Sequence, residues 1–346
     1  MSVDSLPPVF PLKILWSQLK HFLTKQRTHA VLKTVSDRVC SIQKKFLDAH
    51  HAMSSAQLEL HDYISTTEES ELQDQKLFDL LQALLVETDS WVEHVKREVE
   101  RGFIEYYEII KRTDDIMPRV CVKGIDHQGM VYDMSRRANE SVRKSFFYDE
   151  NTAFIRCRGG DEFVCRDIPK QAKKERYFNN RLNKIKVEGY KPIFFLKRWW
   201  QLVSSEEPYE DDNWEECWDV DCEQKDSDSR SYYKSTLVIP ITTTSSTIRR
   251  EVLKELVSIG DEPAFRALGF ICLDHVKTNF FKKTDRLVGW IYADILSEAI
   301  VHKNIFSDSS PSYVKALEKL YDLNFDLYID LTGDVSYLDD DEDKTG

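Results

Sequence analysis

The sequence predicts an α+β protein, in which a helical module (residues 1–113) precedes an antiparallel sheet flanked by helices (residues 114–305). Three observations predict this fold class. Apolar residues recur at three- and four-residue spacing before residue 113, as in amphipathic helices. After Pro118 the pattern changes to short β-branched runs bounded by turn residues, which is typical of strands. A strongly periodic helix, from Asp285 to Val301, then follows the last strand.

The N-terminal module is predicted to contain three or four helices, from apolar stripes at Leu12–Leu23, Val31–Phe46 and Leu77–Tyr106. A polar break near residues 65–70 contains Thr-Thr-Glu-Glu, which fits a capping box that would start the next helix. Gly102 costs about 1 kcal/mol relative to alanine inside a helix, so we expect a bend there. Short connections favour an antiparallel bundle or hairpin.

The sheet region begins with a predicted hairpin, in which Arg119–Lys123 pairs with Gly129–Met134. A second hairpin is predicted from two short runs around Gly159-Gly160-Asp161. Asp167-Ile168-Pro169 would then start a helix that runs to about Leu182, because proline suits the first turn. The runs of the second hairpin are Ala153–Cys157 and Glu162–Cys165.

An insertion at about residues 185–230 interrupts the sheet region, and we expect its acidic, tryptophan-bearing part to be a mobile loop. Tyr233–Ile241 and Ala267–Leu273 are the next two predicted strands. Residues 306–346 are predicted to hold a short helix and a frayed acidic tail.

Charge is distributed unevenly along the chain, although the net charge is −12. Residues 206–230 carry −10 and residues 339–346 carry −4, whereas residues 119–200 carry +9. The folded core is therefore expected to present a basic face. Seven scattered cysteines and the lack of a signal-peptide pattern predict reduced thiols and a cytoplasmic protein. No apolar run reaches the roughly 18 residues of a membrane span.

Several motifs are similar to those of GAF domains, over residues 114–305. The strand Tyr233–Ile241 resembles the family's Y-x-S strand ending in Pro-Ile, and Leu268–Asp274 resembles its Gly-Phe strand ending in aspartate. Asn151–Phe154, Asp167–Pro169 and Tyr177–Arg181 are similar to connecting motifs in a bacterial subset of the family. The resemblance implies a pocket between one face of the sheet and the overlying helices and loops.

Members of that family bind cyclic nucleotides, chromophores, haem or small metabolites in this pocket, or bind nothing. Arginine suits phosphate and carboxylate ligands because it offers two parallel donors. We therefore predict a small anionic ligand, such as a nucleotide or metabolite, and no metal or other cofactor. The alternative is that Arg136, Arg137, Arg156 and Arg158 neutralise the acidic insertion or form a solvated face. In that alternative Asp274 only caps the next segment. The candidate ligand-binding residues are Tyr132, Arg136, Arg137, Arg156, Arg158 and Asp274.

The predicted function is that of a non-catalytic, bacterial-type sensor in signalling. One alternative is a protein-interaction subunit with a degenerate pocket, acting through the N-terminal helices as a homodimer or with a protein partner. A remote alternative is an enzyme like the GAF branch that reduces methionine sulfoxide with cysteines, since Cys157 and Cys165 end the second predicted hairpin. Nucleic acid is disfavoured, because the acidic insertion would repel phosphate.

Overall fold

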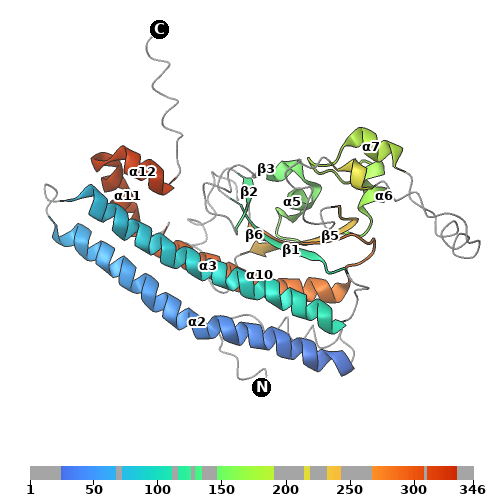
Figure 1. The fold of residues 1–346 in the computed structure, drawn as a ribbon, viewed down its shortest axis with the longest axis horizontal. Coiled ribbons are helices and arrows are strands. Elements are labelled where there is room, and N and C mark those ends of the chain that lie inside the picture. The colour runs from blue at the N-terminus through green and yellow to red at the C-terminus, as the bar shows by residue number, and fades with distance from the viewer. Residues whose placement is uncertain are drawn as a thin grey trace, which may run out of the picture.

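The computed structural model has the architecture of helices packed on a single sheet (Figure 1). It describes residues 25–67, 72–110, 116–125, 129–134, 146–190, 214–218, 232–242, 267–307 and 310–332. The helices are α2 (Lys25–Thr66), α3 (Asp74–Ile110), α5 (Thr152–Cys157), α6 (Ile168–Lys173), α7 (Lys184–Gly189), α10 (Lys283–Phe306), α11 (Pro311–Leu323) and α12 (Phe325–Thr332), with 3-10 turns η4 (Tyr148–Glu150) and η5 (Glu215–Cys217). The strands are β1 (Arg119–Ile125), β2 (Met130–Asp133), β3 (Phe146–Phe147), β4 (Phe163–Cys165), β5 (Ser235–Thr242) and β6 (Ala267–His275). The predicted α+β class is confirmed.

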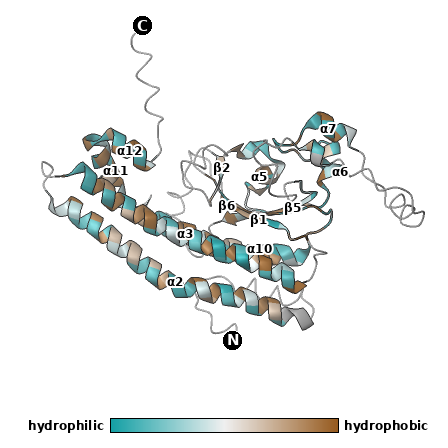
Figure 2. Ribbon diagram, in the orientation of Figure 1, coloured by the Kyte–Doolittle hydropathy of each residue, from teal (hydrophilic) through white to brown (hydrophobic). Residues whose placement is uncertain are grey.

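The long helices α2 and α3 lie side by side and form a helical hairpin (Figure 1). Hydrophobic and hydrophilic bands alternate along both helices, as expected for amphipathic elements (Figure 2). The predicted hairpin is confirmed, whereas the stripe at Leu12–Leu23 lies outside the described residues. Buried residues of α2 follow three- and four-residue spacing and face α3; they include Val31, Val35, Val39, Ile42, Met53, Leu60 and Ile64.

The capping box predicted at residues 66–69 does not start the next helix. Thr66 is the last residue of α2, and its hydroxyl donates to the carbonyl of Asp62 at 2.6 Å. The following helix begins at Asp74, whose carboxylate accepts from the backbone amide of Gln75. Thr66 therefore satisfies a carbonyl at a C-terminus, and the sequence motif indicated the wrong end of a helix.

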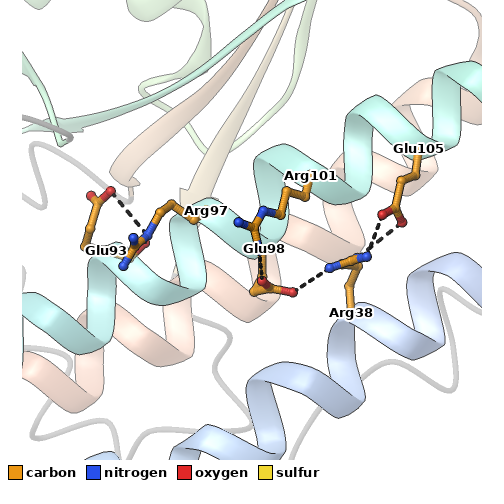
Figure 3. Close-up of polar contacts among 6 residues, drawn as sticks. All are labelled: Arg38, Glu93, Arg97, Glu98, Arg101 and Glu105. Carbon is orange, nitrogen blue, oxygen red and sulfur yellow. Dashed lines mark hydrogen bonds and ion pairs between the residues drawn. The ribbon is translucent and has the colours of Figure 1, made fainter.

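An ion-pair network fixes how α2 and α3 face each other (Figure 3). The guanidinium of Arg38, on α2, donates to Glu98 at 2.9 Å and also to Glu105, both on α3. Arg101 reaches the same Glu98 carboxylate at 3.0 Å. Burial alone would raise the pKa of Glu98, but the hydrogen bond and charge of Arg38, together with Arg101, outweigh it and lower the pKa. The buried Glu98 carboxylate thus has a charged partner on each of the two helices.

Helix α10 lies between the hairpin and the sheet. One side of α3 contacts α2 and another contacts α10, while α10 also packs on β5 and β6. A single hydrophobic core runs through all of these layers, with Leu81, Val99, Ile291 and Leu273 fully buried in it. Among the described residues, no helix combines the length and the apolar character needed to cross a membrane.

Two glycines permit the close contacts of α10. A Cβ on Gly289 would stand 1.8 Å from the Cδ1 of Ile239 on β5. A Cβ on Gly102 of α3 would stand 2.0 Å from the hydroxyl oxygen of Tyr292. Gly102 thus allows α3 and α10 to approach closely. The sequence analysis had interpreted the same glycine as the site of a bend.

The sheet has the strand order β3-β2-β1-β6-β5-β4, and all neighbouring strands pair antiparallel. The predicted pairing of the first two strands is confirmed, with Lys123 opposite Asp133. The predicted strands at Tyr233–Ile241 and Ala267–Leu273 are confirmed as β5 and β6. β1 and β6 therefore occupy the centre, although 141 residues separate their nearest ends.

The second predicted hairpin is wrong, because residues 152–157 form the helix α5. The side chain of Asn151 accepts from the backbone amide of Ala153 and caps this helix. Phe154 and Cys157 are three positions apart and both face the core. The helix that follows Asp167 has proline in its first turn as predicted, but it ends at Lys173 rather than near Leu182. At Glu175 the backbone turns to a φ of 54°, which is incompatible with a continuing helix.

Part of the insertion packs as a second, smaller core, so residues 214–218 are not a mobile loop. Trp214 is fully buried, and its indole nitrogen donates to the carbonyl of Tyr233 at 3.1 Å. Its ring contacts Tyr190 at a centroid distance of 5.0 Å and Trp218 at 6.1 Å. This aromatic cluster joins the insertion to the start of β5.

At the far end of the hairpin, α11 contacts both α2 and α3, and α12 contacts α3. Ser310 caps α11 and also accepts from Gln57 of α2. The predicted short C-terminal helix is confirmed, while the acidic tail lies outside the described residues.

Candidate functional site

The two faces of the sheet differ in chemistry. Residues with even numbers on β1 and odd numbers on β5 and β6, such as Val122, Leu237 and Ile271, belong to the core beneath α10. The opposite face, which we call the distal face, carries the alternate residues of the same strands. On β1 these are Arg119, Cys121 and Lys123, which we call the β1 row.

The β1 row is only half-buried, although β1 lies inside the sheet. Its neighbours on the distal face of β5 and β6 are sealed, with Val238, Phe270 and Cys272 at most 5% exposed. α5 covers that sealed part: the rings of Phe154 and Phe270 lie 4.7 Å apart. The distal face is therefore less completely covered at the β1 row than over β5 and β6, although Cys121 packs against the edge of the sealed cluster.

Arg119 is anchored at one end of the row by a buried carboxylate. Its Nη2 donates to Asp274 at 2.7 Å, and the hydroxyl of Thr236 donates to the other oxygen of the same carboxylate at 2.7 Å. Burial opposes the charge of the guanidinium, but Asp274 outweighs burial and raises the pKa of Arg119. About a third of the Arg119 side chain remains exposed, at 34%, against 4% for Asp274.

Aromatic hydroxyls extend this polar cluster toward the aromatic core of the insertion. The guanidinium of Arg119 lies 5.7 Å from the ring centroid of Tyr233. Asn179 donates to the Tyr233 hydroxyl at 3.1 Å, and burial raises the pKa of that hydroxyl. Burial likewise raises the pKa of Tyr177. Within the described part of the chain, Arg119 Nε is buried without a hydrogen-bond partner.

Only some of the sequence-predicted residues reach this face. Asp274 lies on it, but its oxygens are engaged by Arg119 and Thr236. Tyr132 projects to the other face, since it is the register partner of Gly124 and its ring lies against that glycine. The structure thus separates Tyr132 from Asp274. Arg136 and Arg137 lie outside the described residues.

Arg156, on α5, and Arg158, the residue that follows this helix, lie beside the distal face rather than in the β1 row. α5 packs on β5, where the thiol of Cys157 donates to the carbonyl of Val238 at 3.6 Å. Arg156 is exposed, and the half-buried Arg158 donates to the hydroxyl of Tyr148 at 3.1 Å. Both arginines add positive charge on this side of the sheet.

Sequence reasoning missed the β1 row itself. The segment 119–125 reads Arg-Val-Cys-Val-Lys-Gly-Ile, so its period-two alternation already separated an apolar face from a polar one. That signal could have marked Arg119, Cys121 and Lys123 as a group. The pairing of β1 with β6, which brings Asp274 beside Arg119, could not be read from it.

No family model matches the chain, and no curated protein or solved structure matches it either. Within the described ranges, no three histidine, cysteine, aspartate or glutamate side chains gather as potential metal ligands. The chemistry of the distal face therefore rests on the residues themselves.

The cysteine pair suggested by the sequence lacks its geometric premise. Cys157 belongs to α5 and Cys165 to β4, so they do not end one hairpin. Burial raises the pKa of Cys157 to about 12 and that of Cys165 to about 11. Thiols with such pKa values are poor nucleophiles at neutral pH.

Proposed function

We propose that the chain is a non-catalytic sensor or regulatory protein, whose GAF-like sheet domain binds a small anionic ligand over β1. The observation that carries the proposal is the half-buried β1 row on a strand inside the sheet. An antiparallel sheet commonly keeps one face open to water, and here the cluster around α5 buries the distal residues of β5 and β6 more completely than the β1 row. The long helices all pack on the other face, which leaves the distal face for a ligand.

The charge of this face supports an anion. Arg119 and Lys123 lie on one side of β1, while Arg156 lies on α5 and Arg158 is the residue that follows it. Asp274 offsets Arg119, but it engages Nη2 and leaves Nε unpaired among the described residues. The exposed third of the Arg119 side chain would donate a charge-assisted hydrogen bond to a carboxylate or phosphate oxygen. Burial near the sheet would make that bond stronger than in water.

The first experiment is native mass spectrometry of the purified full chain, before and after denaturation. A small molecule released on denaturation would support the proposal and identify the ligand. A panel of inorganic phosphate, nucleoside triphosphate and dicarboxylates is then tested by thermal denaturation. A ligand at 100 times its Kd stabilises by about 2.7 kcal/mol, which is readily measured.

A matched pair of lysine variants places the ligand. We expect Lys123→Met to lose most of the thermal shift, and Lys315→Met, on the exposed side of α11, to keep it. Equal shifts in both variants would move the site away from β1. No released mass and no shift with any compound of the panel would count against the sensor function.

A second candidate function, protein interaction through the hairpin, is favoured by the outer side of α2. Leu47 and Leu58 are 70% and 59% exposed there. They are eleven residues apart, or about three turns, and so lie on the same side of the helix. We expect a homodimer, dissociated in a Leu47→Glu, Leu58→Glu variant but not in Val314→Glu on α11. Analytical ultracentrifugation measures both, and a monomeric wild-type chain at high concentration would exclude the homodimer.

A further inference from the structure

Two cysteines face each other across the centre of the sheet. Cys121 on β1 is the register partner of Cys272 on β6, and side chains of register partners project from the same face. The backbone amide of Met134 donates to the carbonyl of Val122 at 3.3 Å, so the backbone N–H and C=O groups of Val122 point toward β2. The backbone groups of Cys121, the preceding residue, consequently point toward β6. Cys121 and Cys272 are therefore a pair of the kind that exchanges backbone N–H···O=C bonds.

That geometry brings the two residues within reach of a disulfide. The Cα atoms of a hydrogen-bonded antiparallel pair are about 5.5 Å apart, a common spacing for disulfide-bonded cysteines. The Cβ atoms of such pairs are about 5 Å apart, slightly farther than the roughly 4 Å that a relaxed disulfide needs. A bond between them is expected to form with a small movement of the strands. Strain of this kind also makes a disulfide easier to reduce.

The two thiols are in different surroundings. Cys272 is 5% exposed and sealed beneath α5 together with Phe270, whereas Cys121 is half-buried in the β1 row. Both are free cysteines. Lys123 and Arg119 flank Cys121 on the same face, two residues away in either direction. A small oxidant therefore meets Cys121 first, and Cys272 is the adjacent thiol.

Electrostatics at Cys121 favour its thiolate. The thiol of Cys272 donates a hydrogen bond to Cys121 and lowers the pKa of Cys121, against burial. The positive charges of Lys123 and Arg119 lower it further. The same hydrogen bond, together with burial, raises the pKa of Cys272. A lowered pKa and access to solvent are the properties of oxidisable cysteines.

From this juxtaposition we infer that Cys121 and Cys272 form a reversible, peroxide-sensitive dithiol on the distal face. The Cys121 thiolate attacks one oxygen of a hydroperoxide, breaking the O–O bond and forming a sulfenic acid. With hydrogen peroxide, the leaving hydroxide takes up the thiol proton and departs as water. The Cys272 sulfur then attacks the Cys121 sulfur and displaces its oxygen as a second water. Two thiols are oxidised to one disulfide and one peroxide is reduced to two waters.

The inference does not depend on a bound ligand, so it stands apart from the proposed function. The covalent link would join β1 to β6 two residues before Asp274 on β6. It would also remove the only thiol of the β1 row.

The test uses the full chain, reduced and freed of reductant, and treated with hydrogen peroxide at a small molar excess. Free thiols are blocked with a maleimide, and the chain is digested with trypsin without reduction. We expect the thiols per chain to fall from seven to five. Peptides 120–123 and 267–277 should be recovered as one disulfide-linked species, and thioredoxin or dithiothreitol should restore both thiols.

Four serine variants provide matched controls. Cys121→Ser and Cys272→Ser should each abolish the linked species, and Cys272→Ser should accumulate a sulfenic acid at Cys121 that dimedone traps. Cys157→Ser and Cys165→Ser, also buried but not paired with each other, should leave the linked species unchanged. Retention of all seven thiols in the wild-type chain, linkage of Cys121 to another cysteine, or loss of the link in Cys157→Ser alone would overturn the assignment.

Discussion

The two faces of the sheet are built from the same strands but are covered in different ways. Beneath α10, Val122, Ile239 and Leu273 are fully buried in a core that continues into the helical hairpin. On the distal face there are two separate smaller cores, and the β1 row is half-buried, with Cys121 packed against one of them. The face beneath α10 is the more completely packed of the two, and the distal face carries the residues of both proposals, ligand binding and thiol oxidation.

This difference separates positions where substitution should unfold the protein from positions where it should change only function. A face that packs on a long helix loses dispersion contacts with every deleted methyl group. Substitution of a half-exposed side chain changes the free energy of unfolding much less. Four predictions test how far this contrast holds.

The largest effect is expected from Leu273→Ala, which removes a fully buried side chain beneath α10. We expect the free energy of unfolding to fall by about 2–5 kcal/mol, because the surroundings collapse only partly into the cavity. Lys123→Met, on the adjacent strand but on the distal face, should change it by about 0.5 kcal/mol or less. Chemical denaturation measures both variants. Equal losses would mean that both faces are equally sealed.

The next effect depends on pH and concerns Asp294, a buried carboxylate on α10. Burial, and then the negative charge of Glu298, raise the pKa of Asp294 to about 6, from about 3.8 for the free side chain. The folded state thus holds the proton more tightly, so this group stabilises below pH 3.8 and loses that contribution as the pH rises through 6.

The corresponding variant is Asp294→Asn, which cannot ionise. We expect it to be more stable than wild type by about 1–3 kcal/mol at pH 7.5 and similar near pH 4. Thermal unfolding at a series of pH values measures the difference. A gain that is independent of pH would show that ionisation of Asp294 is not its cause.

A smaller loss is expected on the distal face from Asp274→Asn. The amide keeps an oxygen for Thr236 but no longer neutralises Arg119. Since Arg119 is about a third exposed, solvent screens part of the change, and we expect a loss of about 1–2 kcal/mol. Combining the change with Arg119→Met in a double-mutant cycle isolates the pair. Additive losses would indicate that the two side chains stabilise the fold independently.

The smallest effect is expected from Tyr292→Phe at the contact of α3 and α10. The hydroxyl of Tyr292 is buried without a hydrogen-bond partner among the described residues. Its removal avoids an unpaired polar group, so stability should stay the same or rise by up to about 1 kcal/mol. The denaturation midpoints of wild type and Tyr292→Phe measure this difference in stability. A marked loss of stability in the variant would reveal a hydrogen-bond partner for this hydroxyl.

Sequence reasoning succeeded where a pattern is local. The stripes of the hairpin helices, the β-branched run of β5 and the alternation of β1 each follow from neighbouring residues. It failed at α5, because Ala153–Cys157 has the apolar, β-branched composition of a strand. The segment is nevertheless a helix, which the side chain of Asn151 caps at its N-terminus. The burial of Trp214 depends on Tyr190 and Tyr233, which are distant in sequence, so it could not be predicted.

The candidate site was predicted only in part for the same reason. Asp274 was identified from the strand that contains it, but its partner Arg119 lies 155 residues earlier. Tyr132 was assigned to the same site, and the pleat of β2 places it on the opposite face. Which residues share a face depends on strand order, and one sequence does not reveal that order.

The glycines that α3 and α10 contribute at their contacts leave no spare volume between the sheet and the hairpin. Gly289 meets Ile239 of β5, and three residues later Tyr292 meets Gly102 of α3. Well-packed interiors compress little and pass strain onward. A side chain at either glycine would therefore have to push two neighbouring layers apart. The spacing of the sheet, α10 and the hairpin is thus set, at these two points, by the lack of a single carbon atom.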